Sequence, residues 1–294
     1  MAASSSDAAP HLRPAQLFRE LEKNPRIVVH TNPESEGLIR ARVQGANLAA
    51  DESEILVFLD SHCEAGFRWL ETLIEPIMTD PTMVTIPAID LINDITLDFK
   101  ASGGPFRGGF TNRLDYTWIG LTPAQEKRDR EQPGGHHLIL TPAMPGGLFA
   151  IHRDFWNHIG TYDTDMHVWG GENIEMSLRI WQCGGRMAFV PCSRVGHMFR
   201  TSFKQFKENF PYAFPDGASK TVGRNKARAA EVWIDSPDAK AIAYQHMFGR
   251  RDGTVPPHIE VGDLTERFEL RRRLNCRSYD WYARNIYPDH PLTE

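Results

Sequence analysis

The feature that most constrains the fold is a continuous apolar run at residues 55–59, which ends directly in Asp60, Ser61 and His62. A run without polar alternation is typical of a strand covered on both faces, as in a parallel sheet. In sheets flanked by helices, ligands collect beyond the carboxyl ends of the strands. We therefore expect a buried strand whose end presents Asp60 and His62, two residues apart, to one space.

Segments with helical and strand-like periodicity alternate along the rest of the chain. Helices are predicted at residues 15–23, 37–50, 69–78, 152–159, 172–183, 226–247 (interrupted near Pro237), 266–274 and 278–286. Strands are predicted at residues 27–30, 83–92, 148–151 and 187–191. The alternation predicts an α/β domain at residues 15–290, preceded by a disordered tail at residues 1–14.

Two stretches lack this periodicity. Residues 100–147 are rich in glycine, proline and aromatic residues, which inside an ordered domain indicates a substrate-handling surface. Residues 200–224 are expected to form a long loop.

The composition is that of a globular chain. Of the 294 residues, 41% are hydrophobic and 24% are charged, which allows a sizeable core and argues against a disordered, collagenous or coiled-coil protein. The formal net charge of −5 gives no general reason to expect a nucleic-acid partner. The longest apolar run is far shorter than the roughly 20 residues needed to cross a bilayer. Residues 1–10 also lack the basic end and the apolar stretch of a signal peptide.

The first candidate site is a metal centre at the end of the apolar run. A carboxylate and an imidazole, here Asp60 and His62, suit Mn²⁺ or another borderline divalent cation. His197 follows a glycine near the end of a strand-like segment and is a candidate third ligand, while Arg200 is a candidate for neutralising a diphosphate. The alternatives are an aspartate that caps the turn after its strand, a solvent-exposed His62 and a structural His197.

Glycine pairs mark two further candidate positions. Gly170 and Gly171 precede a predicted helix, so the backbone can approach a ligand, with Glu172 and Asn173 at the helix N-terminus. Helix capping by Glu172 is the alternative interpretation. The pair at 146–147 opens space just before a short strand, although a glycine turn without function has the same pattern.

Taken together and in this order, these motifs resemble the polypeptide N-acetylgalactosaminyltransferases, which start mucin-type O-glycosylation. The resemblance extends from about residue 36 to residue 287, and the stretch from 168 to 200 is close to diagnostic for the family. The matching motifs lie at residues 36–42, 60–64, 89–90, 146–149, 169–175, 179–185, 191–200, 211–212 and 230–233.

The resemblance implies a GT-A glycosyltransferase fold, an α/β structure built round one mixed sheet. It also implies metal-dependent transfer of GalNAc from UDP-GalNAc to a Ser or Thr of a protein or peptide, with retention of the anomeric configuration. Mn²⁺ would be held against the diphosphate by Asp60, His62 and His197. Glu172 and Asn173 would serve catalysis, with Glu172 positioning sugar and acceptor rather than acting as a covalent nucleophile.

The resemblance also implies binding roles for other residues. The positions that match the donor site are Arg42, Ser61, Gly146, Gly147, Trp169, Arg200 and Tyr212. Phe110 and Phe199 match an apolar pocket for the acceptor peptide. Asn112 stands where the family usually places an aromatic residue, so we expect this pocket to be weakened.

The four cysteines are Cys63, Cys183, Cys192 and Cys276; the even count permits two disulfides, whereas four reduced thiols are the expectation for a cytosolic protein. The resemblance implies a disulfide between Cys183 and Cys276, formed in the Golgi lumen. It leaves Cys192 as an odd thiol and Cys63 as a free, buried thiol.

The chain departs from the family most at its N-terminus. Family members carry strands there that form the uracil and ribose side of the nucleotide site, and this sequence begins after them. We therefore expect a GT-A catalytic domain that lacks its first strands, its membrane anchor and its lectin domain. The alternative function is an inactive truncated product, or a non-catalytic partner or regulator of intact transferases.

Overall fold

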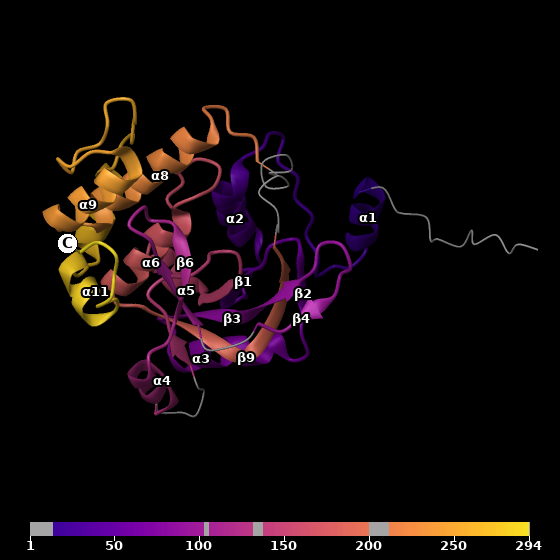
Figure 1. Ribbon diagram of the computed structural model, residues 1–294. Helices are drawn as coiled ribbons and strands as arrows, with labels where there is room; N and C mark the ends of the chain where they lie inside the picture. The colour runs from indigo at the N-terminus through magenta and orange to yellow at the C-terminus, as the bar shows by residue number, and fades with distance from the viewer. Residues whose placement is uncertain (1–13, 103–105, 132–137, 200–211, 294) are drawn as a thin grey trace, which may run out of the picture. The chain divides into compact units, whose positions relative to one another are not determined.

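The computed structural model describes residues 14–102, 106–131, 138–199 and 212–293 (Figure 1). The chain divides into two compact units, residues 1–35 and residues 36–294. The first unit contains helix α1 (Pro14–Leu21), which confirms the helix predicted there within two residues at its C-terminal end. The strand predicted at 27–30 is wrong, because these residues form no ladder and Val28 remains 68% exposed. A short apolar run becomes a strand only where a neighbouring strand can accept its backbone hydrogen bonds.

The second unit is built round one mixed sheet. Its central order is β1 (Ile55–Phe58), β8 (Phe149–His152), β3 (Met83–Ile92), β9 (Arg186–Met198) and β2 (Cys63–Ala65). Strands β3 and β9 run parallel, and the other pairs run antiparallel. Two short strands extend this sheet, with β4 (Phe99–Lys100) on β3 and β7 (Ile139–Leu140) on β9. The predicted mixed sheet is therefore confirmed.

The sequence-based interpretation of the strand at 55–59 needs a correction. Among the described strands, β1 lies at one end of the sheet and pairs only with β8, in the antiparallel direction. Its side chains alternate between buried and half-buried positions, so it is not covered equally on both faces. An apolar run indicates that its side chains are buried, but it does not indicate whether the neighbouring strand is parallel or antiparallel.

The two faces of the sheet pack into different apolar clusters. Phe149 and Ile151 point into the larger cluster with helices α6 (Glu172–Gln182) and α8 (Ala218–Trp233). Ala150, between them on the same strand, joins the smaller cluster formed with α3 (Trp69–Thr79). This alternation follows from the two-residue period of a strand. Figure 1 shows α3 beside β3 and β9, the strands that it contacts.

The remaining elements complete the second unit. Its other helices are α2 (Gly37–Leu48), α4 (Pro123–Arg130), α5 (Arg153–His158), α9 (Pro237–Phe248), α10 (Thr265–Arg273) and α11 (Tyr279–Asn285). A separate hairpin consists of β5 (Phe106–Phe110) and β6 (Tyr116–Gly120). None of the helices in the described part of the chain is both long and apolar enough to span a membrane.

Most predicted elements of this unit occur within a few residues of their expected bounds, and the exceptions are β9, which continues seven residues beyond its predicted end to Met198, and α8. Helix α8 begins at Ala218, inside the stretch predicted to be a loop, and ends at Trp233. The predicted interruption near Pro237 is real, since α9 starts with that proline in its first turn. Residues 200–211 of the predicted loop lie outside the described residues.

Helix α6 is the central helix of the larger cluster, and every residue in it except Asn173 is buried. Two of its charged residues, Glu175 and Arg179, form a buried ion pair with N–O distances of 2.8 Å. The indole N–H of Trp233 donates to the same glutamate at 2.8 Å, and Arg179 donates to the carbonyl of Ile159. These bonds satisfy groups whose burial without partners would cost several kcal/mol.

A disulfide joins Cys183, at the end of α6, to Cys276 after α10, as the resemblance implied. The other two cysteines are free thiols: Cys192 is exposed and Cys63 is half-buried, rather than buried as predicted.

Removing this disulfide should destabilise the chain. The bond closes a loop with a sequence separation of 93 residues, and such loops contribute about 2–4 kcal/mol by restricting the unfolded state. We expect the double variant Cys183→Ser/Cys276→Ser to lose that amount in urea unfolding followed by circular dichroism. Cys192→Ser is the matched control and should change stability by less than about 0.5 kcal/mol. Equal stability of the two variants would contradict this role.

Candidate metal centre and adjoining cavity

Asp60, His62 and His197 meet at the end of the sheet. One ligand atom from each residue lies within 4.8 Å of the other two. Asp60 follows β1, His62 precedes β2, and His197 lies in β9. The pairing of β2 with β9 places Cys63 opposite His197, so the two imidazole rings come together with centroids 4.5 Å apart. The expectation that Asp60 and His62 face one space is confirmed by this cluster.

The carboxylate of Asp60 contacts the side chains of His197 and Arg42. Its Oδ2 lies 3.3 Å from Nε2 of His197, and its Oδ1 accepts a hydrogen bond from Arg42 at 2.8 Å. Burial by itself would raise the pKa of Asp60. The His197 hydrogen bond and the charge of Arg42 outweigh burial, so the pKa lies below its ordinary value. Asp60 is therefore a carboxylate at neutral pH and is able to bind a cation.

Arg42 extends from α2 into the same cavity and is only 10% exposed. Besides Asp60, its guanidinium donates to the backbone carbonyls of Gly146 and Gly147, the second at 2.8 Å. Burial opposes the charge, but Tyr162 and Asp60 outweigh it and raise the pKa of Arg42. The planar guanidinium thus fixes three oxygen atoms from two distant segments.

The glycine pair at 146–147 is required by close packing. A Cβ at Gly147 would lie 2.6 Å from Oδ2 of Asp60, and one at Gly146 would lie 2.7 Å from Cβ of Asn173. Gly146 also has a φ of +86°, which disfavours any other residue. These glycines therefore leave the space beside the carboxylate open, as the sequence suggested.

The segment before α6 forms another wall of the cavity. Gly170 and Gly171 have φ angles of +100° and +90°, and they let the chain turn sharply into the helix. Glu172 is 4% exposed, and its Oε2 accepts a hydrogen bond from the backbone N–H of Gly170 at 2.6 Å. Burial raises the pKa of Glu172. Glu172 therefore lines the cavity and bonds to the turn before α6, whereas, among the described residues, the N-terminus of this helix has no side-chain cap hydrogen bond.

The first cavity, which contains the three candidate ligands, has a volume of about 440 Å³. Most of the predicted site residues line it together. They are Arg42, Asp60, His62, Gly146, Gly147, Trp169, Glu172, Asn173, His197, Phe199 and Tyr212.

Two predicted site residues that the structure describes, Ser61 and Phe110, are not among those that line it. Ser61 lies between Asp60 and His62 in the chain, is exposed, and is not part of the cavity wall. Phe110 is 1% exposed and packs against Tyr282 and Tyr287 in the core. Arg200 lies outside the described residues.

The sequence interpretation missed other residues of the cavity wall. Asp115 and Lys226 form an ion pair there, although they lie 111 positions apart in the chain. Tyr116 and Trp118 also line the first cavity from β6. No local pattern marks these residues, since each sits among ordinary polar or aromatic neighbours, and only the tertiary fold brings them to the site.

The cluster fits a divalent cation on its own chemistry. One carboxylate and two imidazoles form a mixed oxygen and nitrogen donor set, which suits Mn²⁺ or Zn²⁺ and leaves positions for further oxygen ligands. His197 Nδ1 is buried without a hydrogen-bond partner among the described residues, whereas its Nε2 faces the carboxylate of Asp60. The arrangement can therefore hold a cation beside a cavity lined by Arg42 and Glu172.

Comparison with sequence families identifies the chain. The family described as "Glycosyl transferase family 2" matches residues 8–154, which is half of the chain. The chain belongs to glycosyl transferase family 2. A second family, described as "N-terminal domain of galactosyltransferase", matches residues 140–204.

Relatives within this family are polypeptide N-acetylgalactosaminyltransferases. The chain is 42% identical to polypeptide N-acetylgalactosaminyltransferase 4 of Caenorhabditis elegans over 273 residues, covering 93% of this chain and 43% of that protein. It is 40% identical to polypeptide N-acetylgalactosaminyltransferase 14 of Homo sapiens, covering 92% of this chain and 46% of that protein. The chain thus spans less than half the length of these relatives. The resemblance stated from the motifs is confirmed.

A solved structure agrees with this assignment. GalNAc-T7, determined with UDP, GalNAc and Mn²⁺, superposes with a TM-score of 0.77 and 36% sequence identity. The superposition covers 94% of this chain and 49% of that one. The predicted GT-A fold is therefore confirmed.

The two free thiols should differ in reactivity. Burial raises the pKa of Cys63 to about 11, so little thiolate is present at mildly alkaline pH, whereas Cys192 is exposed. We expect iodoacetamide to label Cys192 at least about tenfold faster in the folded chain. Peptide mass spectrometry over time measures both rates, and labelling in urea, where the rates should converge, is the control. Equal rates in the folded chain would contradict the burial of Cys63.

Proposed function

We propose that the chain is the catalytic region of a retaining transferase that moves GalNAc from UDP-GalNAc to Ser or Thr of proteins. The observation that carries the proposal is the cluster of Asp60, His62 and His197 in a cavity also lined by Arg42 and Glu172. The named activity of its relatives supports the choice of sugar and acceptor.

Asp60, His62 and His197 are proposed to hold Mn²⁺, the ion present in the GalNAc-T7 structure. A bound dication supplies positive charge opposite the diphosphate as UDP departs. Arg42 keeps the Asp60 carboxylate ionised and directed at the cluster. Arg200, outside the described residues, is proposed to neutralise the same leaving group.

The sugar is proposed to lie against Arg42, Gly147 and Glu172. Gly147 leaves room beside the carboxylate of Asp60, and the carboxyl group of Glu172 lines the same cavity, where its oxygens can accept hydrogen bonds from hydroxyl groups. Glu172 is held by the Gly170 N–H, so it is suited to positioning rather than to covalent attack. Asn173 donates to the carbonyl of Met144 at 3.1 Å and is proposed to hold the loop beside Gly146.

Other contacts are assigned with the same reasoning. Trp169, Tyr212 and Gly146 line the cavity and are proposed donor contacts, together with Ser61, which precedes the ligand His62. Phe199 is 38% exposed beside His197 and is a proposed acceptor contact. Phe110, at 1% exposed, would have to move to touch an acceptor, so its proposed role is support of the acceptor wall.

The disulfide between Cys183 and Cys276 supports a location in an oxidising compartment. We propose the Golgi lumen, where O-glycosylation of secreted proteins takes place. This location is proposed for the full-length protein, since the chain covers only 43% and 46% of its two named relatives.

A transfer assay tests the proposed function directly. The full chain, UDP-GalNAc, Mn²⁺ and a Thr-containing peptide should give a product heavier by one GalNAc in mass spectrometry, and EDTA should abolish it. His197→Ala should lower the rate by at least about a hundredfold, because it removes a metal ligand. His246→Ala changes an exposed histidine of α9 and is the control. Transfer by His197→Ala at the unmodified rate would refute the assignment of this ligand.

A second variant tests the space beside Asp60. In Gly147→Ala the new Cβ would lie 2.6 Å from the carboxylate, so Asp60 must move and Mn²⁺ affinity should fall by about tenfold or more. Gly120→Ala is the matched control, since a Cβ there meets nothing within 4 Å. Calorimetric titration with Mn²⁺ in the presence of UDP measures both. Equal affinities would show that Asp60 does not bind the metal in this position.

A further inference from the structure

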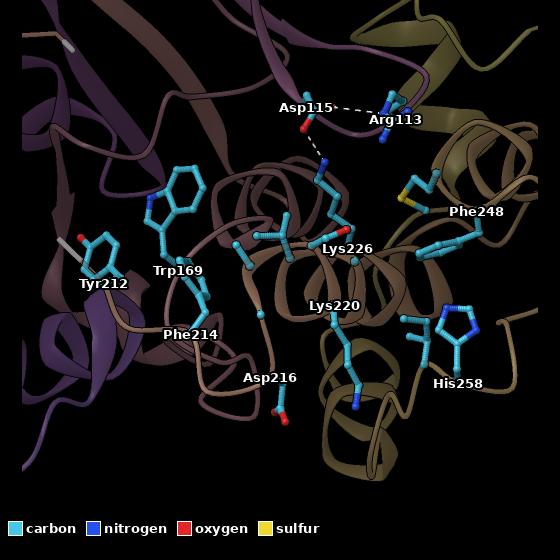
Figure 2. Close-up of a pocket in the computed structure, with 17 residues that line it drawn as sticks. Arg113, Asp115, Trp169, Tyr212, Phe214, Asp216, Lys220, Lys226, Phe248 and His258 are labelled. Carbon is cyan, nitrogen blue, oxygen red and sulfur yellow. Dashed lines mark hydrogen bonds and ion pairs between the residues drawn. The ribbon is translucent and has the colours of Figure 1, made fainter. Parts of the chain in front are cut away.

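A second, larger cavity of about 1210 Å³ adjoins the first (Figure 2). Five residues line both cavities: Asp115, Trp169, Tyr212, Val222 and Lys226. Because the two cavities share these walls, a ligand that reaches the metal cluster from this side can extend into the second cavity. The second cavity contains none of the three candidate metal ligands.

The walls of the second cavity are largely apolar and aromatic. Figure 2 shows Trp169, Tyr212 and Phe214 on one side and Phe248 on the other, with the start of α8 between them. A phosphate or a single sugar uses few such contacts, whereas an extended polypeptide with apolar side chains uses many. The size and lining of the cavity therefore favour a segment of polypeptide.

Three cations, Arg113, Lys220 and Lys226, and two carboxylates, Asp115 and Asp216, line this cavity, so one positive charge is in excess. Asp115 pairs with Lys226, whose side chain is only 10% exposed, and it also lies 3.9 Å from Arg113. These contacts offset the charge of Lys226. Lys220 is exposed on the first turn of α8, and within the described part of the chain no carboxylate lies in ion-pair distance of it. The cavity thus carries one positive charge in excess, and Lys220, with Asp216 four residues before it in the chain, is its exposed cation.

Helix α8 fixes the backbone of Lys220 relative to the first cavity. Val222 and Lys226 pack onto Gly170 and Gly171, where a Cβ would lie 2.8 Å and 3.2 Å from their side chains. The same glycines lead into Glu172 at the start of α6. Because the helices are closely packed, the backbone of Lys220 stays at a constant distance from the proposed sugar position.

We propose that the second cavity binds the part of the acceptor polypeptide next to the Ser or Thr, and that Lys220 selects acceptors with an acidic side chain there, beside an apolar or aromatic one. This inference rests on the proposed function, which supplies the acceptor. Lys220 acts on substrate selection and takes no part in the transfer step.

Peptide binding tests the selection. Each fluorescein-labelled peptide contains one Thr and one Phe. Each peptide also contains one charged residue, either Glu or Lys, and the position of this residue before or after the Thr is varied across the set. Fluorescence anisotropy with the full chain, Mn²⁺ and UDP measures the Kd. At one or more positions the Glu peptide should bind about threefold or more tightly than the Lys peptide, the size expected for an exposed charge pair.

Charge reversal assigns the effect to Lys220. In Lys220→Glu the preference should invert, so that the Lys peptide binds more tightly at the same position. Lys220→Gln should abolish the preference without inverting it. Lys127→Glu is the matched control, because Lys127 is exposed on α4 and lines neither cavity.

The other outcomes overturn the proposal. An unchanged preference in Lys220→Glu, or the absence of peptide binding by a chain that still binds Mn²⁺ and UDP, contradicts it and leaves the proposed function intact. Peptide that binds in the absence of UDP and is displaced when UDP is added would assign the second cavity to the donor instead. Failure of the proposed function is separate, since it appears as a lack of transfer to every peptide in the mass-spectrometric assay.

Discussion

The site depends on one interaction, the ion pair between Arg42 and Asp60. The guanidinium and the carboxylate are only 10% and 20% exposed, and their contact at 2.8 Å joins α2 to the end of β1. The same guanidinium donates to the carbonyls of Gly146 and Gly147, so that it also fixes the loop before β8. Removing one member would leave the other half-buried without its partner, which costs more than the pair itself contributes. The guanidinium of Arg42 therefore positions both the metal cluster and the wall of the cavity.

The remaining parts of the fold hold this ion pair in place. Strand pairing sets His197 beside His62, and α6 begins at the site with Glu172 and ends at the disulfide of Cys183. Because that helix is buried along nearly its whole length, its first turn cannot shift without disturbing the core. The same helix thus connects the proposed chemistry of the cavity with the stability of the domain.

Sequence reasoning succeeded where the information is local. The run before Asp60, the two glycines before Glu172 and the break at Pro237 each constrain a short segment, and the structure contains all three. It failed where the outcome depends on distant partners. The residues at 27–30 found no strand to pair with, and Phe110 went into the core rather than the cavity. The Asp115–Lys226 pair joins two unremarkable positions, so only the assembled fold reveals it.

The central claim is that Asp60, His62 and His197 together bind one divalent cation. Pulsed electron paramagnetic resonance on the Mn²⁺-loaded chain tests it most directly, because ¹⁴N couplings report imidazole nitrogen bound to the metal. We predict couplings from two imidazoles, reduced to one in His62→Gln and in His197→Gln, and unchanged in the control His246→Gln. Mn²⁺ that binds without any nitrogen coupling would contradict the account.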